Sequence, residues 1–199
     1  VGSGNEGTTA GHAAGEYRKG MMTEVQLAVQ QREKSFSLQI WKSYVDEVAI
    51  TIVDPSGNHS GRLEEKEGTQ RIQIGETELL VYYGEPKPYS IRQEIYIDMI
   101  PVTNYITSGV WQIILNPTRV VEGQYDLWLP SENVLNRGTG FLYPDEEVTL
   151  TIPSTAEKVI SVGAYDALTF SYAPFSGRGY TWQDERTKPD LVAPGVNVR

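Results

Sequence analysis

Cysteine is absent from this sequence, and histidine occurs only twice, as His12 and His59. The lack of cysteine excludes disulfides, thiol catalysis and cysteine-ligated zinc or iron–sulfur sites. The two histidines lie far apart in sequence, and neither has a second candidate ligand at a spacing typical of metal sites. We therefore predict that the chain binds no metal ion and no other cofactor.

Basic residues are also scarce, with 17 Lys and Arg against 26 Asp and Glu, which gives a formal net charge of −9. This balance argues against nucleic acid as a partner and against binding to an anionic membrane surface, because both require a basic face. No apolar run approaches the roughly 20 residues of a membrane helix. The hydrophobic fraction of 39% is that of an ordinary globular protein.

What the sequence does contain is a long series of alternating apolar and polar residues between residues 23 and 152. An alternation of period two is typical of strands that bury one face. We expect about nine strands at the spacing of an all-β fold, and a jelly-roll-like antiparallel β-sandwich. The same pattern is compatible with a closed barrel. The expected strands lie around 25–29, 36–40, 48–52, 71–74, 79–83, 95–99, 111–115 (ending at Asn116-Pro117), 125–129 and 148–152.

Large aromatic residues recur along these strands and allow two interpretations. They could form a platform on which carbohydrate rings stack, or they could be ordinary core and cross-strand packing residues, which we favour. Neighbouring pairs such as Ile40-Trp41 point to opposite faces, so some aromatic surface should face outward. The aromatic residues in question are Trp41, Trp111, Trp128, Tyr82, Tyr83, Tyr96 and Tyr125.

The two ends of the chain have a different character from its middle. The run 159–164 is almost continuously apolar, which is typical of a strand buried on both faces of a parallel sheet. We therefore predict three parts: residues 1–22, an inserted β-sandwich over 23–152, and residues 153–199. The fold class is then mainly β, with the sandwich inserted into a truncated remnant of an α/β parallel sheet.

Four short motifs carry a specific resemblance. "GNEG" at 4–7, "VISVGAYD" at 159–166, "FSGRG" at 175–179 and "KPDLVAPGVNV" at 188–198 occur in the order found in subtilisin-like serine peptidases, the subtilases. The resemblance covers roughly residues 1–20 and 153–199. The middle block resembles the jelly-roll insert of bacterial spore-germination subtilases, which implies a secreted or spore-associated location.

The resemblance implies a role for Asn5, which occupies the position of the asparagine that donates to the oxyanion of the tetrahedral intermediate. Gly4 and Gly7 would let the backbone turn tightly beside it. Gly2, Ser3 and Gly4 would resemble the wall of the substrate pocket, with Glu6 at its rim. The alternative is that Asn5 is a plain turn residue.

In subtilases the catalytic triad runs in the order Asp, His, Ser, with the oxyanion asparagine between His and Ser. We find no triad motif in these residues, and His12 follows the asparagine motif. We therefore expect a fragment of a serine endopeptidase that cleaves peptide or protein substrates, inactive by itself and prone to self-association or domain exchange. Two alternatives stay open: a β-sandwich that binds a partner protein, a propeptide or a glycan, and a parent with a degraded triad.

Overall fold

The computed structural model of the chain describes residues 1–88, 90–131, 133–180 and 186–198. It divides into two compact units. We call Ala10–Pro144 the sandwich unit, and Val1–Thr9 together with Asp145–Arg199 the parallel-sheet unit. All regular elements of the described residues are strands, and none of these residues forms a helix long and apolar enough to cross a membrane.

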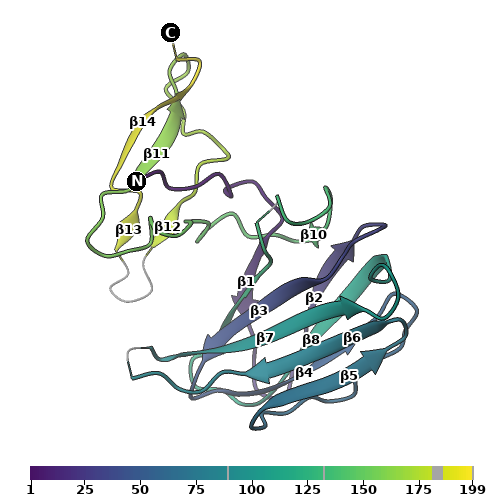
Figure 1. Cartoon of the computed structure of the whole chain (residues 1–199). Coiled ribbons are helices and arrows are strands. Elements are labelled where there is room, and N and C mark those ends of the chain that lie inside the picture. Colours follow the sequence, from purple (N-terminus) through teal and green to yellow (C-terminus); the bar gives the residue numbers. More distant parts are fainter. Residues whose placement is uncertain (89, 132, 181–185, 199) are drawn as a thin grey trace. The chain divides into compact units, whose positions relative to one another are not determined.

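The sandwich unit consists of two antiparallel sheets that lie face to face (Figure 1). The larger sheet has six strands in the order β1-β9-β3-β7-β6-β5, and the smaller has four in the order β10-β2-β8-β4. Two separate sheets make a sandwich and not a closed barrel. The larger sheet contains β1 (His12–Glu16), β3 (Phe36–Ser43), β5 (Thr69–Ile74), β6 (Thr77–Tyr83), β7 (Arg92–Pro101) and β9 (Gln124–Trp128). The smaller contains β2 (Thr23–Val29), β4 (Glu47–Val53), β8 (Gly109–Arg119) and β10 (Gly140–Phe141).

The core of the sandwich comes from the inward positions of these alternating strands. Leu27, Ile50, Ile97 and Leu127 are at most 1% exposed. Trp111 is wholly buried among them, and its indole N–H donates to the carbonyl oxygen of Thr107 at 2.8 Å. A buried indole needs such a partner, since an unpaired N–H in the core is costly.

The outward face of the larger sheet carries a row of aromatic and polar residues. Trp128 lies opposite Gln39, Gln39 opposite Tyr96, and Tyr96 opposite Tyr82, so the four side chains share one face. Trp41 lies on the same face beside Glu94. The packing interpretation is correct for Trp111, Tyr83 and Tyr125, which are buried, whereas the outward group is half-buried or exposed.

Two expectations about individual strands were wrong. Residues 148–152 form no strand: Val148 has a φ of +56° and Ile152 is 89% exposed. β8 does not end at Asn116-Pro117 but continues to Arg119. A proline is tolerated there because the partner strand β2 begins only at Thr23, opposite Leu115, so no residue of β2 needs an amide donor from position 117.

The strand β1 was not predicted, because "HAAGE" has no apolar alternation. It pairs with β9 along its whole length, from His12 opposite Trp128 to Glu16 opposite Gln124. The compact sandwich unit accordingly begins at Ala10 and ends at Pro144, whereas the sequence placed the insert at 23–152.

The parallel-sheet unit contains β11 (Val162–Asp166) paired in parallel with β14 (Leu191–Val196). A parallel bridge between Gly2 and Val162 adds the start of the chain on the other side of β11. A short antiparallel pair, β12 (Gly179–Tyr180) and β13 (Thr187–Lys188), completes the unit. The parallel pairing was expected, but β11 is half-buried over most of its length instead of covered on both faces.

Candidate active-site loop

The loop of residues 3–7 begins where the N-terminal segment leaves the parallel sheet. The amide of Val162 donates to the Val1 carbonyl at 2.8 Å, and the amide of Ser3 donates to the Val162 carbonyl at 2.9 Å. These two bonds fix the chain up to Ser3 against β11. The residues after Ser3 leave the sheet, so their position depends on contacts with other segments of the unit.

Two glycines of this loop occupy places where a side chain would not fit. Gly4 has a φ of +101°, and a Cβ there would lie 2.5 Å from the hydroxyl oxygen of Thr151. A Cβ on Gly7 would lie 2.6 Å from the carbonyl oxygens of Pro174 and Ser176. Gly4 is therefore needed for its backbone conformation and for the close approach of Thr151, and Gly7 is needed for the close approach of the neighbouring backbone.

Residues 175–177 form backbone hydrogen bonds to the loop on both sides of Asn5. The Gly7 amide donates to the Phe175 carbonyl at 2.9 Å, and the Gly177 amide donates to the Gly4 carbonyl at 3.0 Å. Asn5 lies between these two anchors. Its side chain is exposed and makes no hydrogen bond to any described residue. The loop thus presents a free amide donor on a backbone that is fixed before and after it.

The other predicted substrate-binding residues, Gly2, Ser3 and Glu6, differ in how exposed they are. Gly2 is exposed, and no atom lies within 4 Å of where its Cβ would be, so it leaves open space. Ser3 is 2% exposed and its hydroxyl meets that of Ser176 at 3.0 Å, so its side chain faces the protein. Glu6 is half-buried, and its carbonyl accepts bonds from the amide and hydroxyl of Thr9.

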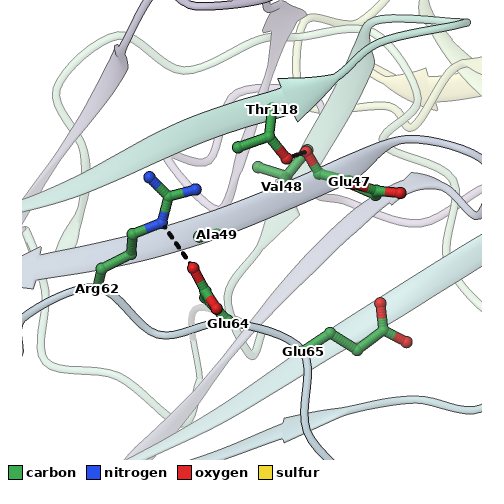
Figure 2. A pocket seen from close by; sticks show the side chains of 7 residues that line it. All are labelled: Glu47, Val48, Ala49, Arg62, Glu64, Glu65 and Thr118. Carbon is green, nitrogen blue, oxygen red and sulfur yellow. Dashed lines mark hydrogen bonds and ion pairs between the residues drawn. The ribbon is translucent and has the colours of Figure 1, made fainter.

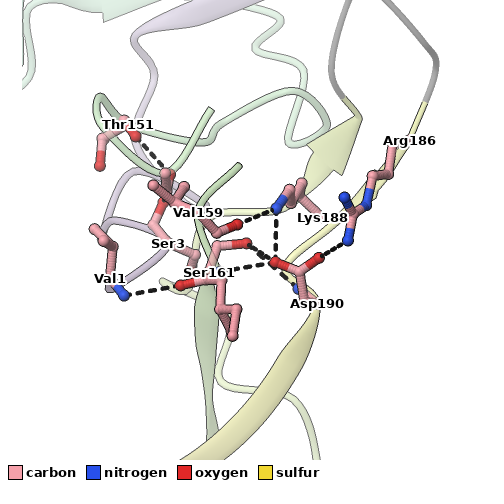
Figure 3. Close-up of polar contacts among 10 residues, drawn as sticks. Val1, Ser3, Thr151, Val159, Ser161, Arg186, Lys188 and Asp190 are labelled. Atoms are coloured by element: carbon pink, nitrogen blue, oxygen red, sulfur yellow. Dashed lines mark hydrogen bonds and ion pairs between the residues drawn. The ribbon is translucent and has the colours of Figure 1, made fainter. Parts of the chain in front are cut away.

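A second polar cluster lies at the start of β14, and sequence reasoning did not assign it a role. Asp190 accepts bonds from the Ser161 amide at 2.7 Å, from Lys188 at 2.6 Å and from Arg186 at 2.8 Å (Figure 3). The Lys188 hydrogen bond, followed by the Ser161 amide, holds the pKa of Asp190 well below its usual value. The Lys188 ammonium is buried and also donates to the Val159 carbonyl at 2.7 Å.

This cluster ties the segment before β11 to the segment before β14, next to the bond from the N-terminal amine to Ile160 (Figure 3). The cluster therefore fixes the segments before β11 and β14 against each other, and the N-terminal segment pairs with β11 through its own backbone bonds. The sequence feature that corresponds to this cluster is the "KPD" of the last motif, in which a basic and an acidic residue flank a proline.

The sandwich unit has polar features of its own. A hollow of about 440 Å³ is lined by Glu47, Glu64 and Glu65, but Arg62 pairs with Glu64 at 3.1 Å (Figure 2). Among the described residues no group of three or more His, Cys, Asp or Glu side chains could hold a metal ion.

His12 is buried in β1 and is not part of the candidate loop. Its Nε2 lies 3.0 Å from Asp126, its ring stacks on Trp128 at 4.7 Å, and Arg92 pairs with the other carboxylate oxygen of Asp126. These contacts join β1, β9 and β7 on the outward face of the larger sheet. His59 is exposed in the turn that follows β4.

Comparisons with known proteins give a consistent picture. Residues 142–199 match the family model of the subtilase family. The chain is similar to the solved structure of the CspB protease of Clostridium perfringens, with 38% sequence identity and a TM-score of 0.90. The match covers 100% of this chain and 41% of that protease, so the chain spans less than half of its length. A search of curated proteins found no match.

Proposed function

We propose, from the chain's relationship to the subtilisin-like serine peptidases, that these residues belong to a serine endopeptidase in which Asn5 stabilises the oxyanion. The observation that carries the proposal is the Asn5 side chain itself. It is exposed and unbonded among the described residues, on a loop anchored at Gly4 and Gly7.

This arrangement suits a donor that acts in the transition state. When a serine attacks a peptide carbonyl, negative charge develops on the carbonyl oxygen. A donor already fixed in place stabilises that charge without first reorganising. The ground-state carbonyl carries less charge and is held less strongly, so the interaction lowers the barrier more than it improves substrate binding.

The nucleophile and its partners would lie in the parent protein outside residues 1–199. Peptide-bond hydrolysis would then follow the Ser-His-Asp acyl-transfer mechanism. We propose that a polypeptide of residues 1–199 alone does not hydrolyse peptides. A fluorophosphonate probe should label the parent and leave the isolated polypeptide unlabelled. A parent that also resists the probe would support the alternative of a degraded triad.

The decisive experiment uses Asn5→Ala and Asn5→Gly in the parent protease. Both remove the amide donor, and both should lower kcat by about 10²–10³ with little change in KM; this range is the one known for the corresponding subtilisin residue. The exposed Asn104 in the sandwich unit provides a matched Asn→Ala control, which should leave kcat unchanged. If Asn5 were only a turn former, Asn5→Gly would be nearly harmless, because glycine accepts turn conformations readily. A fully active Asn5→Gly enzyme would therefore refute the proposal.

A second candidate function concerns the sandwich unit, and the outward aromatic row favours it. Trp128, Tyr96 and Tyr82 lie on three strands, and strands in a sheet are spaced about 4.8 Å apart. The Gln39 amide donates to Glu94 at 2.8 Å beside this row, which leaves the other Glu94 oxygen available for a hydroxyl group. Aromatic rings interleaved with such groups suit an extended, uncharged glycan, whose rings have apolar faces and hydroxyl edges.

The charge of the same face supports an uncharged ligand. Glu94 and Asp98 are acidic residues of this face that would repel an anionic polysaccharide, whereas Glu78 is paired with Arg71 at 3.0 Å. Isothermal titration of the chain with neutral oligosaccharides tests this function. Tyr96→Ala should abolish binding, and Tyr105→Ala, at an exposed loop tyrosine, should not. Binding that survives both substitutions would exclude the aromatic row as the site.

A further inference from the structure

The hydroxyl of Ser176 joins three separate segments of the parallel-sheet unit. Ser176 is 1% exposed. Its Oγ lies 3.0 Å from the Ser3 hydroxyl, 2.9 Å from the Ala164 amide and 3.0 Å from the Tyr172 hydroxyl. Ser3 belongs to the N-terminal segment and Ala164 to β11, so one small side chain connects the candidate loop to the sheet.

The direction of each hydrogen bond follows from the number of donors and acceptors. A serine hydroxyl donates once and accepts twice. The Tyr172 hydroxyl donates to the Gly177 carbonyl at 2.9 Å, so its oxygen accepts from Ser176. The Ala164 amide can only donate. The remaining lone pair of Ser176 therefore accepts the proton of the Ser3 hydroxyl, and the hydrogen-bonding capacity of Ser176 is fully used.

Three consecutive residues thus hold the loop that carries Asn5. Phe175 accepts from the Gly7 amide, Ser176 accepts from the Ser3 hydroxyl, and Gly177 donates to the Gly4 carbonyl. Only the central one of these links is made by a side chain, and only it is also anchored to β11. We propose that Ser176 is a positioning residue that fixes the backbone on both sides of Asn5, and hence its amide, relative to the parallel sheet. The inference rests on the proposed function of Asn5.

Little free space remains beside the hydroxyl groups of Ser176 and Tyr172. A Cβ on Gly163 would lie 2.9 Å from the Tyr172 hydroxyl and 3.2 Å from Ser176 Oγ. Glycine at this position of β11 therefore leaves room for the two hydroxyl groups beside the strand.

Hydrogen exchange on the chain tests the positioning without any activity. Ser176→Ala should speed exchange of the Gly7 and Gly177 amides, because their shared anchor to β11 is lost. Ser171→Ala provides the matched control, since Ser171 is exposed and, among the described residues, its hydroxyl hydrogen-bonds only to that of Thr169. Unchanged exchange at both glycines in Ser176→Ala would overturn the proposal.

Kinetics of the parent protease test the consequence for catalysis. Ser176→Ala should lower kcat about tenfold or more with KM little changed, because small displacements of a positioned group cost up to about 100-fold. In an Asn5→Ala background the same substitution should lower kcat no further, since it acts through Asn5. A purely structural role would give the same loss in both backgrounds and would overturn the proposal.

A third variant covers the case in which Ser176→Ala does not fold. Ser3→Ala removes one hydrogen bond of the network and leaves Ser176 its other two. It should lower kcat less than Ser176→Ala and should also have no effect once Asn5 is replaced. If Asn5→Ala itself leaves kcat unchanged, the proposed function fails. If Asn5→Ala is damaging while Ser176→Ala and Ser3→Ala are not, only the positioning role fails.

Discussion

Asp46 offers the most quantitative prediction about the sandwich unit. It lies in the turn between β3 and β4 and is 1% exposed. One carboxylate oxygen accepts bonds from the Tyr17 hydroxyl at 2.8 Å and the Gly123 amide at 2.9 Å. The other accepts from the Val121 amide at 2.5 Å and the Glu122 amide at 3.1 Å. Burial alone would raise the pKa of Asp46, but these donors hold it below its usual value.

The four donors differ in what happens when the carboxylate is removed. Val121 and Glu122 are exposed, so water can replace Asp46 at their amides. Tyr17 and Gly123 are buried, and each orphaned buried donor costs about 1–3 kcal/mol. Asp46→Ala should therefore destabilise the fold by about 2–6 kcal/mol. Asp46→Asn can turn its remaining oxygen toward the buried pair, so we expect a smaller loss of about 1–2 kcal/mol.

Urea unfolding of the chain, followed by tryptophan fluorescence, measures these losses. With a slope of about 2 kcal/mol/M, Asp46→Ala should lower the midpoint by roughly 1–3 M. Asp98→Ala is the control, because Asp98 lies half-exposed on the outward face of β7 and should change stability by less than about 0.5 kcal/mol. The reasoning is refuted if Asp46→Ala costs no more than this control, or if Asp46→Asn costs more than Asp46→Ala.

Two further predictions concern the parallel-sheet unit. Hydrogen bonds lower the pKa of Asp190 in the folded state. The contribution of Asp190 to the free energy of unfolding should therefore be fully present above the unfolded-state pKa of about 3.9. It should be lost as the pH falls through the lower folded-state pKa. The difference in thermal midpoint between the wild type and Asp190→Asn should therefore be constant from pH 5 to 7 and shrink below about pH 4; a difference that grows on acidification would contradict this. The polypeptide of residues 1–199 should self-associate in concentrated solution, since Ile160, Leu191 and Val192 are 65%, 49% and 45% exposed. Light scattering that shows a strict monomer at high concentration would exclude this.

Alternation in the sequence was informative wherever a strand has one buried face. It located the strands around Leu27, Ile40 and Ile97, because most inward residues are apolar and most outward ones are polar or aromatic. Lys42 and Gln93 are exceptions, since both are polar and lie buried on the inward face. The same rule produced the false strand at 148–152. There the apolar residues alternate, but Thr149 and Thr151 bond instead to Arg178 and Ser3. Local periodicity cannot reveal such a long-range choice.

The candidate site was predictable in part. Asn5 was identified through the order of four motifs, and the local backbone around it agrees with the need for glycine at positions 4 and 7. The contact between Ser3 and Ser176 spans 173 positions, and nothing in the spacing of two serines indicates that they meet. Side-chain networks of this kind depend on the sheet that brings the segments together, so they become visible only in three dimensions.

The connections of the sandwich explain how so large a segment can interrupt a small parallel sheet. Within the sandwich unit the two ends lie side by side, since the Phe141 amide donates to the Ala10 carbonyl at 2.8 Å. Within the parallel-sheet unit the interrupted chain is also closed, since the Thr151 amide donates to the Ser3 carbonyl at 3.1 Å. Both units therefore meet the condition under which one domain can be inserted into another, which is that the chain ends are close together.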